Sequence, residues 1–192
     1  MTSLVKAGLL AAVASLAAAS GPADDEFKPE EGYTSLFNGR DLSGWKPGKT
    51  DKESLDGKTE AFGGRFRVRD GVIVVHEGRG IQDLYTVKEF NKDFHLKLEF
   101  RAAPRADSGL YIRGKQLQVR DYPTVGPYKN LKHFKNGDWN ELDVTVKGTS
   151  ARCLCNDEVV EEAFKIPAKG QIGLQAEVGK FEFRRIRIKE LP

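Results

Sequence analysis

The sequence predicts an all-β fold, a two-sheet antiparallel β-sandwich or jelly roll that forms a single domain. Apolar residues alternate with polar residues or form short blocks, and Gly, Pro, Asn and Asp interrupt these blocks at short intervals. No stretch keeps a helical spacing for long enough to predict a helix within the domain. Many short strands in a domain of this size are typical of a sandwich or jelly roll.

The first segment, residues 1–19, has the pattern of a cleavable signal peptide. Lys6 provides the early positive charge, and an apolar run ends in small residues that fit cleavage after Ala19. The run is short for a bilayer about 30 Å thick, so an uncleaved membrane anchor is the weaker alternative. We therefore expect export to the periplasm or the extracellular space, and no membrane association once the signal peptide is removed.

Residues 20–31 are mostly charged and polar, and we expect them to form a disordered linker before a domain that spans residues 32–192. The whole chain has 31 Lys and Arg against 28 Asp and Glu. This small excess favours neither nucleic acid nor an anionic membrane as a partner. Cys153 and Cys155 lie two residues apart, so on a strand they share one face. We expect two buried thiols, with a strained local disulfide as the alternative.

The alternation places the strands between turn signals such as Asp70-Gly71, Lys147-Gly148 and Asn156-Asp157. In the last strand, the apolar residues change from odd to even positions near Arg184-Arg185, which predicts a β-bulge there. The predicted strands are 66–68, 72–76, 84–86, 94–101, 109–113, 116–120, 139–147, 151–156, 159–164, 171–177 and 181–189.

The strand 94–101 has two distinct faces. Its even-numbered residues are apolar and predict a core face, whereas His95, Lys97, Glu99 and Arg101 predict a polar face. Two interpretations of the polar face are open. It is either an ordinary solvated surface with cross-strand ion pairs or the sugar-binding side of the sandwich.

Seven segments carry a resemblance to a known family. They are GYTSLFNGRDLSGW at 32–45, LEFR at 98–101, DSGLYIR at 107–113, QLQVRD at 116–121, WN at 139–140, IGLQ at 172–175 and EFRRIRI at 182–188. Together they resemble the 3-keto-disaccharide hydrolase domain family, a sugar-active jelly roll of the concanavalin A-like type. The resemblance spans nearly all of the chain after residue 30.

The resemblance implies an activity on disaccharides or glycosides that are oxidised at C3. The ketone acidifies the C2 hydrogen, so a base removes that proton, an oxyanion stabiliser holds the enolate, the C1–oxygen bond breaks and water adds back. Glu99 or Asp121 would transfer the proton, and Arg113 would polarise the keto oxygen. The side chains expected to bind the substrate are Arg101, His95, Gln116, Gln118, Tyr128 and Gln175.

Gln116 departs from the family pattern, because a Glu is common at this position and a Gln cannot transfer a proton at neutral pH. The catalytic role has therefore been lost or moved, or position 116 only orients a hydroxyl. Tyr128 lies in a long connection between residues 121 and 138, which is typical of a binding loop or lid. Trp45 and Trp139 are expected to be structural, packed residues.

Two functions remain open at this point: an enzyme that cleaves 3-keto-glycosides, and a non-catalytic carbohydrate-binding module. A structural adhesion domain is a third possibility, because a fold does not determine a function. We expect no cofactor, although carboxylates and backbone carbonyls could still form a calcium site that no motif reveals. The enzyme hypothesis requires Glu99, Arg113, Gln118 and Asp121 to converge in one cleft.

Overall fold

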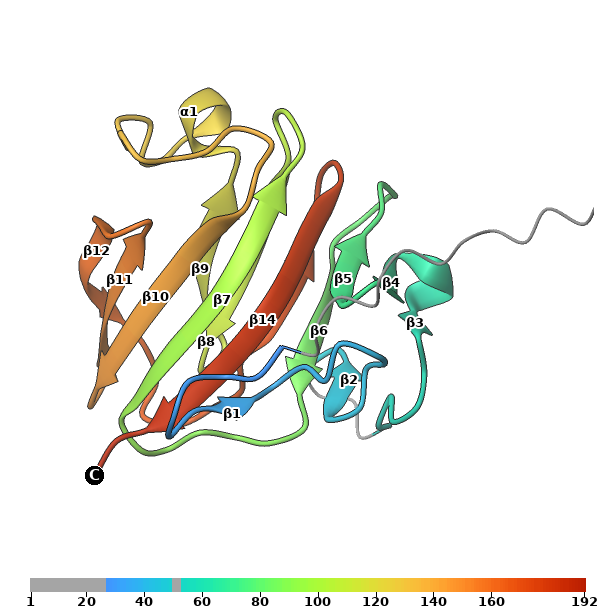
Figure 1. Cartoon of the computed structure of the whole chain (residues 1–192), viewed down its shortest axis with the longest axis horizontal. Coiled ribbons are helices and arrows are strands. Elements are labelled where there is room, and N and C mark those ends of the chain that lie inside the picture. The colour runs from blue at the N-terminus through green and yellow to red at the C-terminus, as the bar shows by residue number, and fades with distance from the viewer. Residues whose placement is uncertain (1–26, 50–52) are drawn as a thin grey trace, which may run out of the picture.

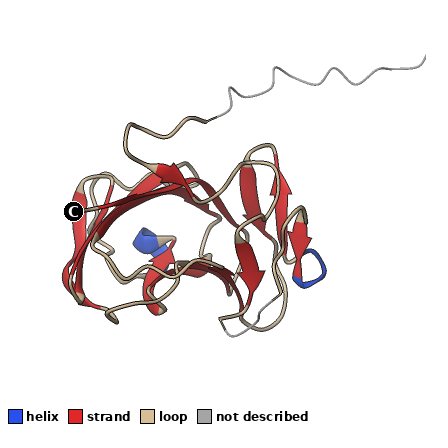
Figure 2. Cartoon of the chain, turned by 90° about the horizontal axis from the view of Figure 1, so that it is seen from below, coloured by secondary structure: helices blue, strands red, loops and turns tan. Residues whose placement is uncertain are grey.

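The computed structural model describes residues 27–49 and 53–192, and the expected signal peptide lies outside these ranges. The chain folds into two antiparallel sheets that pack face to face, which confirms the predicted sandwich (Figure 1). Viewed from below, the strands form two layers around the core (Figure 2). None of the helices in the described ranges has the length and apolar character needed to cross a bilayer.

The large sheet has nine strands in the order β12-β11-β10-β7-β14-β5-β4-β3, and the short β1 pairs with β14 outside this path. Their bounds are β1 Thr34–Ser35, β3 Glu60–Ala61, β4 Phe66–Arg69, β5 Val72–Val75, β7 Phe94–Ala102, β10 Asn140–Lys147, β11 Ser150–Cys155, β12 Glu158–Lys165 and β14 Phe181–Glu190.

The small sheet has five strands in the order β2-β6-β13-β8-β9. Their bounds are β2 Trp45–Pro47, β6 Gln82–Thr86, β8 Asp107–Ile112, β9 Lys115–Arg120 and β13 Gly173–Ala176. Two short helices, η1 at Phe62–Gly64 and α1 at Tyr122–Val125, complete the fold. The strands missed from the sequence, β1, β2 and β3, have only two or three residues each, which is too few for an alternation to appear.

The alternation predicted the core correctly. Phe94, Leu96, Leu98 and Phe100 of β7 are fully buried between the sheets, while the residues between them are partly exposed. The predicted bulge in β14 is also confirmed, because the register against β7 shifts between Arg184 and Arg187. The bulge keeps both apolar pairs of β14 in the core although their positions differ in parity.

The two cysteines are free thiols buried in the core, as expected. Burial raises the pKa of each thiol to about 12, so neither is a reactive thiolate at neutral pH. Trp45 is buried as expected, and its indole Nε1 donates to the carbonyl of Leu36 at 2.7 Å.

Residues 27–31, which the sequence assigns to the linker, rest on the outer surface of the large sheet. Glu30 accepts two hydrogen bonds from Arg187 of β14, at 2.7 and 2.8 Å. The ring of Phe27 lies beneath the guanidinium groups of Arg185 and Arg187, at 5.4 and 5.6 Å from its centroid. These contacts fix where the chain enters the domain.

Replacing Glu30 by Gln is expected to lower the stability slightly at neutral pH, and this difference should vanish in acid. The hydrogen bond from Arg187 lowers the pKa of Glu30 from 4.5 to about 2. Because the pKa falls on folding, the pair stabilises the fold above about pH 4.5, and this contribution is lost as the pH falls toward 2. Urea unfolding of both proteins at several pH values measures the difference, about 1 kcal/mol or less for such an exposed pair. A difference that persists at the lowest pH would contradict the prediction.

Candidate functional site

The outward side of the small sheet forms a polar surface, which we call the glutamine face. Leu110 of β8, Leu117 of β9 and Leu174 of β13 point inward and are buried, so the residues that alternate with them point outward. Amides, acids, phenols and a guanidinium therefore share one surface. The glutamine face consists of Asp83, Tyr85, Asp107, Tyr111, Gln116, Gln118, Arg120, Gln175 and Glu177.

Two glycines leave room for the side chains that lie across this face. A Cβ atom at Gly109 of β8 would lie only 2.7 Å from Nε2 of Gln116. A Cβ atom at Gly173 of β13 would lie 2.7 Å from the ring of Tyr85. Gly109 is therefore needed for the close approach of Gln116 in the middle of β8.

A chain of hydrogen bonds runs across the glutamine face. Nε2 of Gln116 donates to Oε1 of Gln175 at 2.7 Å, and Nε2 of Gln175 donates to the hydroxyl of Tyr111 at 2.9 Å. The Tyr111 hydroxyl in turn donates to Oδ2 of Asp83 at 3.2 Å. The four side chains come from β9, β13, β8 and β6, so the chain joins four neighbouring strands. The structure thus brings together residues far apart in the sequence.

A second polar group lies at the other end of the face. Nε of Arg120 donates to Oε1 of Gln118 at 2.8 Å and lies 2.6 Å from Oδ1 of Asp107. Burial raises the pKa of Asp107, and the neighbouring Arg120 opposes this change. The guanidinium and the carboxylate therefore form an ion pair on this face.

Glu177 differs from the other acids of the face. It is partly exposed, and within the described part of the chain its carboxylate makes no hydrogen bond or ion pair. Burial, followed by the negative charges of Asp107 and Asp83, raises the pKa of Glu177. A reachable carboxylate with a raised pKa is the type of group that serves as a general base.

A buried arginine holds the backbone of Glu177 in place. Nη2 of Arg65 donates to the carbonyl oxygen of Glu177 at 2.8 Å, and only 6% of Arg65 is exposed. Arg65 directly precedes β4 of the large sheet, so this bond ties the two sheets together beside the glutamine face. The backbone of Glu177 is thus held in place by a side chain from the large sheet.

The predicted convergence of the site residues is wrong. His95, Glu99 and Arg101 lie on the outer side of the large sheet, opposite the glutamine face across the sandwich. Only Gln116, Gln118 and Gln175 of the predicted set share the glutamine face. The alternation along β7 predicted correctly which of its residues point outward. It could not show that β7 and the strands with the three glutamines belong to different sheets.

On the large sheet, Glu99 and Arg101 form ion pairs with residues of the neighbouring strand. Oε2 and Oε1 of Glu99 accept from Arg184 at 2.7 Å and Arg185 at 2.9 Å. Burial would raise the pKa of Glu99, but these two arginines bring it below its usual range. Arg101 pairs in the same way with Glu182 of β14. This side of the sandwich therefore matches the ordinary interpretation of a solvated sheet with ion pairs.

His95 belongs to a separate network on the same side. Its Nδ1 lies 2.6 Å from the hydroxyl of Tyr33, and its Nε2 contacts Oδ1 of Asp143. Nζ of Lys97 lies 3.3 Å from Oδ2 of the same Asp143. This network links the N-terminal segment to β7 and β10, remote from the glutamine face.

Arg113 is a structural residue in the turn between β8 and β9, not a member of a sugar site. It adopts a left-handed conformation with φ of 51°, followed by Gly114 at 80°. Because β8 ends at Ile112, the turn reverses the chain, and Arg113 does not share the face of Tyr111. Its guanidinium donates to the carbonyls of Gly148 at 2.6 Å, Lys92 at 2.6 Å and Pro167 at 3.3 Å. Only 2% of Arg113 is exposed.

Asp121 and Tyr128 also have structural environments. Oδ2 of the buried Asp121 accepts from the backbone N–H of Arg105 at 2.8 Å, just before α1. The ring of Tyr128 packs edge-on against the buried Tyr122, and its hydroxyl donates to Glu161 at 2.6 Å. The long connection that contains them therefore closes one end of the core rather than the glutamine face (Figure 1).

The prediction that Trp139 is packed in the core is wrong. It is partly exposed, and the guanidinium groups of Arg184 and Arg101 lie 3.9 and 4.8 Å from its ring centroid. Cation–π contacts with these arginines hold it on the outer side of the large sheet.

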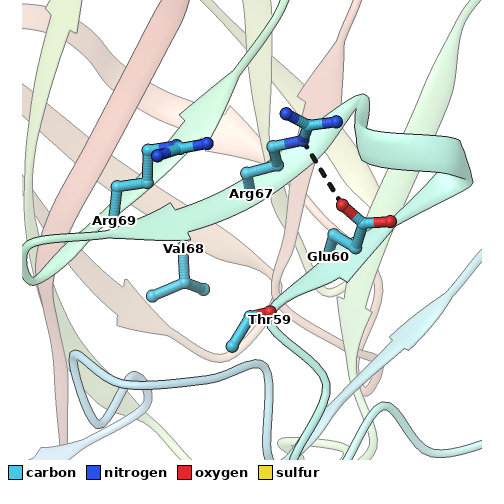
Figure 3. A pocket seen from close by; sticks show the side chains of 5 residues that line it. All are labelled: Thr59, Glu60, Arg67, Val68 and Arg69. Carbon is cyan, nitrogen blue, oxygen red and sulfur yellow. Dashed lines mark ion pairs between the residues drawn. The ribbon is translucent and has the colours of Figure 1, made fainter.

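Two open hollows on the surface lie away from the glutamine face. One, of about 380 Å³, is at the β3–β4 edge, where Arg67 and Arg69 extend from one side of β4 and Arg67 faces Glu60 (Figure 3). The other, of about 460 Å³, lies between the loop after α1 and β12. Within residues 27–49 and 53–192, no three His, Cys, Asp or Glu side chains are placed to hold a metal ion.

Comparison with known families identifies the chain. Residues 32–189 match the family model of the 3-keto-alpha-glucoside-1,2-lyase-like domain. The chain belongs to this family. The resemblance inferred from the sequence motifs is thereby confirmed, and the lyase-like domain accounts for nearly all of the described residues. No curated protein matches the chain.

Solved structures agree on the fold of this lyase-like domain. A candidate glycosyl hydrolase from Parabacteroides distasonis has a TM-score of 0.66 and 22% identity, over 88% of this chain and 100% of its own. A second such protein from the same organism has a TM-score of 0.55 and 21% identity, over 77% and 99%. The VIP36 exoplasmic/lumenal domain, solved with Ca²⁺ and Man3GlcNAc, has a TM-score of 0.50 and 12% identity, over 83% and 91%.

Sequence reasoning missed several members of the glutamine face of this lyase-like domain. A signal was present, because Asp107, Gly109 and Tyr111 alternate with core residues on one strand, and Gln175 and Glu177 do so on another. Residues two positions away from Gln116, Gln118 and Gln175 on the same strands point to the same side, so the alternation could have predicted that they share this face. Asp83 carried no such signal, since only its pairing with Gln175 places it on this face.

Proposed function

We propose that the glutamine face binds a 3-keto-glycoside and that Glu177 removes the proton at C2 of the sugar. The observation that carries the proposal is the accessible carboxylate of Glu177, whose raised pKa makes it a suitable base beside a row of fixed amide and phenol groups. The family assignment supports a glycoside as the substrate class.

The reaction divides into two steps. Glu177 takes the C2 proton, and the electrons of the C2–H bond form an enolate whose negative charge lies on the C3 oxygen. The enolate then reforms the C3 ketone, a C1=C2 double bond forms, and the C1–oxygen bond breaks. The departing oxygen takes up a proton, for which protonated Glu177 is a source, and the product is an unsaturated ketone. Addition of water across C1=C2 would complete a net hydrolysis.

The other groups of the face have matching roles. Arg120 supplies positive charge for the enolate oxygen, because a guanidinium keeps its charge at every relevant pH. We expect Gln118 and Tyr111, which are both partly exposed, to bind sugar hydroxyls, and the ring of Tyr111 to contact a pyranose ring.

Incubation of the purified protein with a 3-keto-disaccharide tests the proposal. We expect release of the free second sugar and an ultraviolet-absorbing enone, and a Gln175→Ala variant should reduce the rate about tenfold by disordering the face. Failure of the wild-type protein to cleave a panel of 3-keto-glycosides would contradict the proposal.

A second function, non-catalytic carbohydrate binding on the same face, is favoured by one observation. Gln116 places an amide where the resemblance leads us to expect an acid. Calorimetric titration with unmodified and 3-keto sugars separates the two functions, since a binding module would bind without turnover.

A further inference from the structure

The hydrogen-bond chain of the glutamine face can run in only one direction. An ionised carboxylate can only accept, so Asp83 requires the Tyr111 hydroxyl as a donor. The Tyr111 oxygen then accepts from Nε2 of Gln175, which turns Oε1 of Gln175 toward Gln116. The group at position 116 must therefore donate, and an amide can do so.

We propose that Gln116 is a positioning residue whose amide sets the direction of this chain and so supplies Asp83 with its proton donor. This inference rests on the proposed function, because the oriented chain forms the floor on which the sugar would lie beside Glu177. It also explains why this protein has an amide at a position where the family often has a carboxylate. The acid needed for proton transfer lies at Glu177 instead.

A carboxylate at position 116 would reverse the chain. A Glu there would face Oε1 of Gln175 with only acceptors, so the Gln175 amide would have to rotate. The Tyr111 hydroxyl would then donate to Gln175, and Asp83 would lose its donor. Because Gln175 is only 2% exposed, water cannot readily replace the lost bonds.

The surroundings of Asp83 make this loss measurable. Burial already raises the pKa of Asp83, and the hydrogen bond from Tyr111 opposes the rise. The titratable or charged groups around Asp83 come from four segments. They are Tyr85 on its own strand, Tyr111 on β8, Glu177 after β13, and Lys46 of β2, which lies opposite Tyr85 in the sheet register. Removal of the Tyr111 donor should therefore move the titration of Asp83 upward.

The test is a carbonyl-detected NMR titration of Asp83 in the full domain, without substrate. We expect the midpoint of the Asp83 titration to rise in Gln116→Glu and in Tyr111→Phe. Added to Tyr111→Phe, Gln116→Glu should raise it by no more than Gln118→Glu does alone, since both changes remove the same bond and only the added charge remains. Gln118→Glu is the matched control. It adds the same charge on the same strand and face, but Gln118 bonds Arg120 and lies outside the chain.

The inference would be overturned if Gln116→Glu moves the midpoint no further than Gln118→Glu, or if its effect adds fully to that of Tyr111→Phe. Thermal unfolding establishes that each variant is folded. If Gln116→Glu does not fold, Tyr111→Phe, which removes a single hydroxyl, still tests whether the Tyr111 donor controls the titration of Asp83. With a 3-keto-glycoside, Gln116→Glu should lower kcat about tenfold. An inactive wild-type protein would refute the proposed function, while the titration would still decide the inference.

Discussion

A Glu177→Gln variant is expected to cleave 3-keto-glycosides about a hundredfold to ten-thousandfold more slowly than the wild-type protein. The amide has nearly the same shape as the carboxylate but cannot accept the C2 proton. The bond from Arg65 reaches the backbone carbonyl of Glu177, so the substitution leaves that contact intact. Steady-state kinetics should show the loss in kcat with little change in KM.

The pH dependence of the same reaction gives an independent check. Because burial and Asp107 raise the pKa of Glu177, the base is protonated up to a higher pH than an ordinary glutamate. The rate should therefore rise with pH through this raised pKa. Replacing Asp107 by Asn removes a negative neighbour and should move the rise to lower pH.

Comparison with Glu99→Gln decides between the two assignments of the base. The family resemblance implied Glu99 or Asp121 as the base. The structure holds Glu99 between two arginines on the opposite side of the sandwich and buries Asp121 against the backbone of Arg105. A loss of turnover in Glu99→Gln with full turnover in Glu177→Gln would refute the present assignment. Glu162→Gln, on the exposed face of β12, serves as a matched substitution remote from both.

Replacing Arg113 by Met is expected to lower the free energy of unfolding by about 3 kcal/mol or more. The guanidinium donates to three backbone carbonyls from different loops, and hydrogen bonds from charged groups contribute about 1.5 to 3 kcal/mol each. Methionine fills similar space but leaves those carbonyls without a donor. Urea unfolding followed by fluorescence measures the change.

An Arg113→Asn variant separates the contribution of the side-chain hydrogen bonds to stability from that of the turn conformation. Asn tolerates the left-handed conformation of this position, so it keeps the turn and loses only the three bonds. We expect it to be destabilised nearly as much as Arg113→Met. If both variants instead unfold like the wild-type protein and lose only affinity for sugar, the predicted substrate role of Arg113 would be correct and the structural role wrong.

Local patterns in the sequence were enough to predict the sandwich, the faces of its longer strands, the β14 bulge and the buried thiols. These features follow from the two-residue period of a strand, which depends only on neighbouring residues. The family also followed from the sequence, since its motifs are short and occur in a set order. Very short strands such as β2 and β3 were not predicted, because they are too short to show an alternation of apolar and polar residues.

The location of the site depended on the tertiary structure. Parity shows that Glu99 and Gln118 both point outward, but it cannot show that they belong to different sheets. The predicted strand 109–113 would place Arg113 on the face of Tyr111, but β8 ends at Ile112 and the chain turns at Arg113. Gln116, Gln175 and Asp83 meet only because β9, β8, β13 and β6 are neighbours, and strand order is set by long-range pairing that no local spacing records.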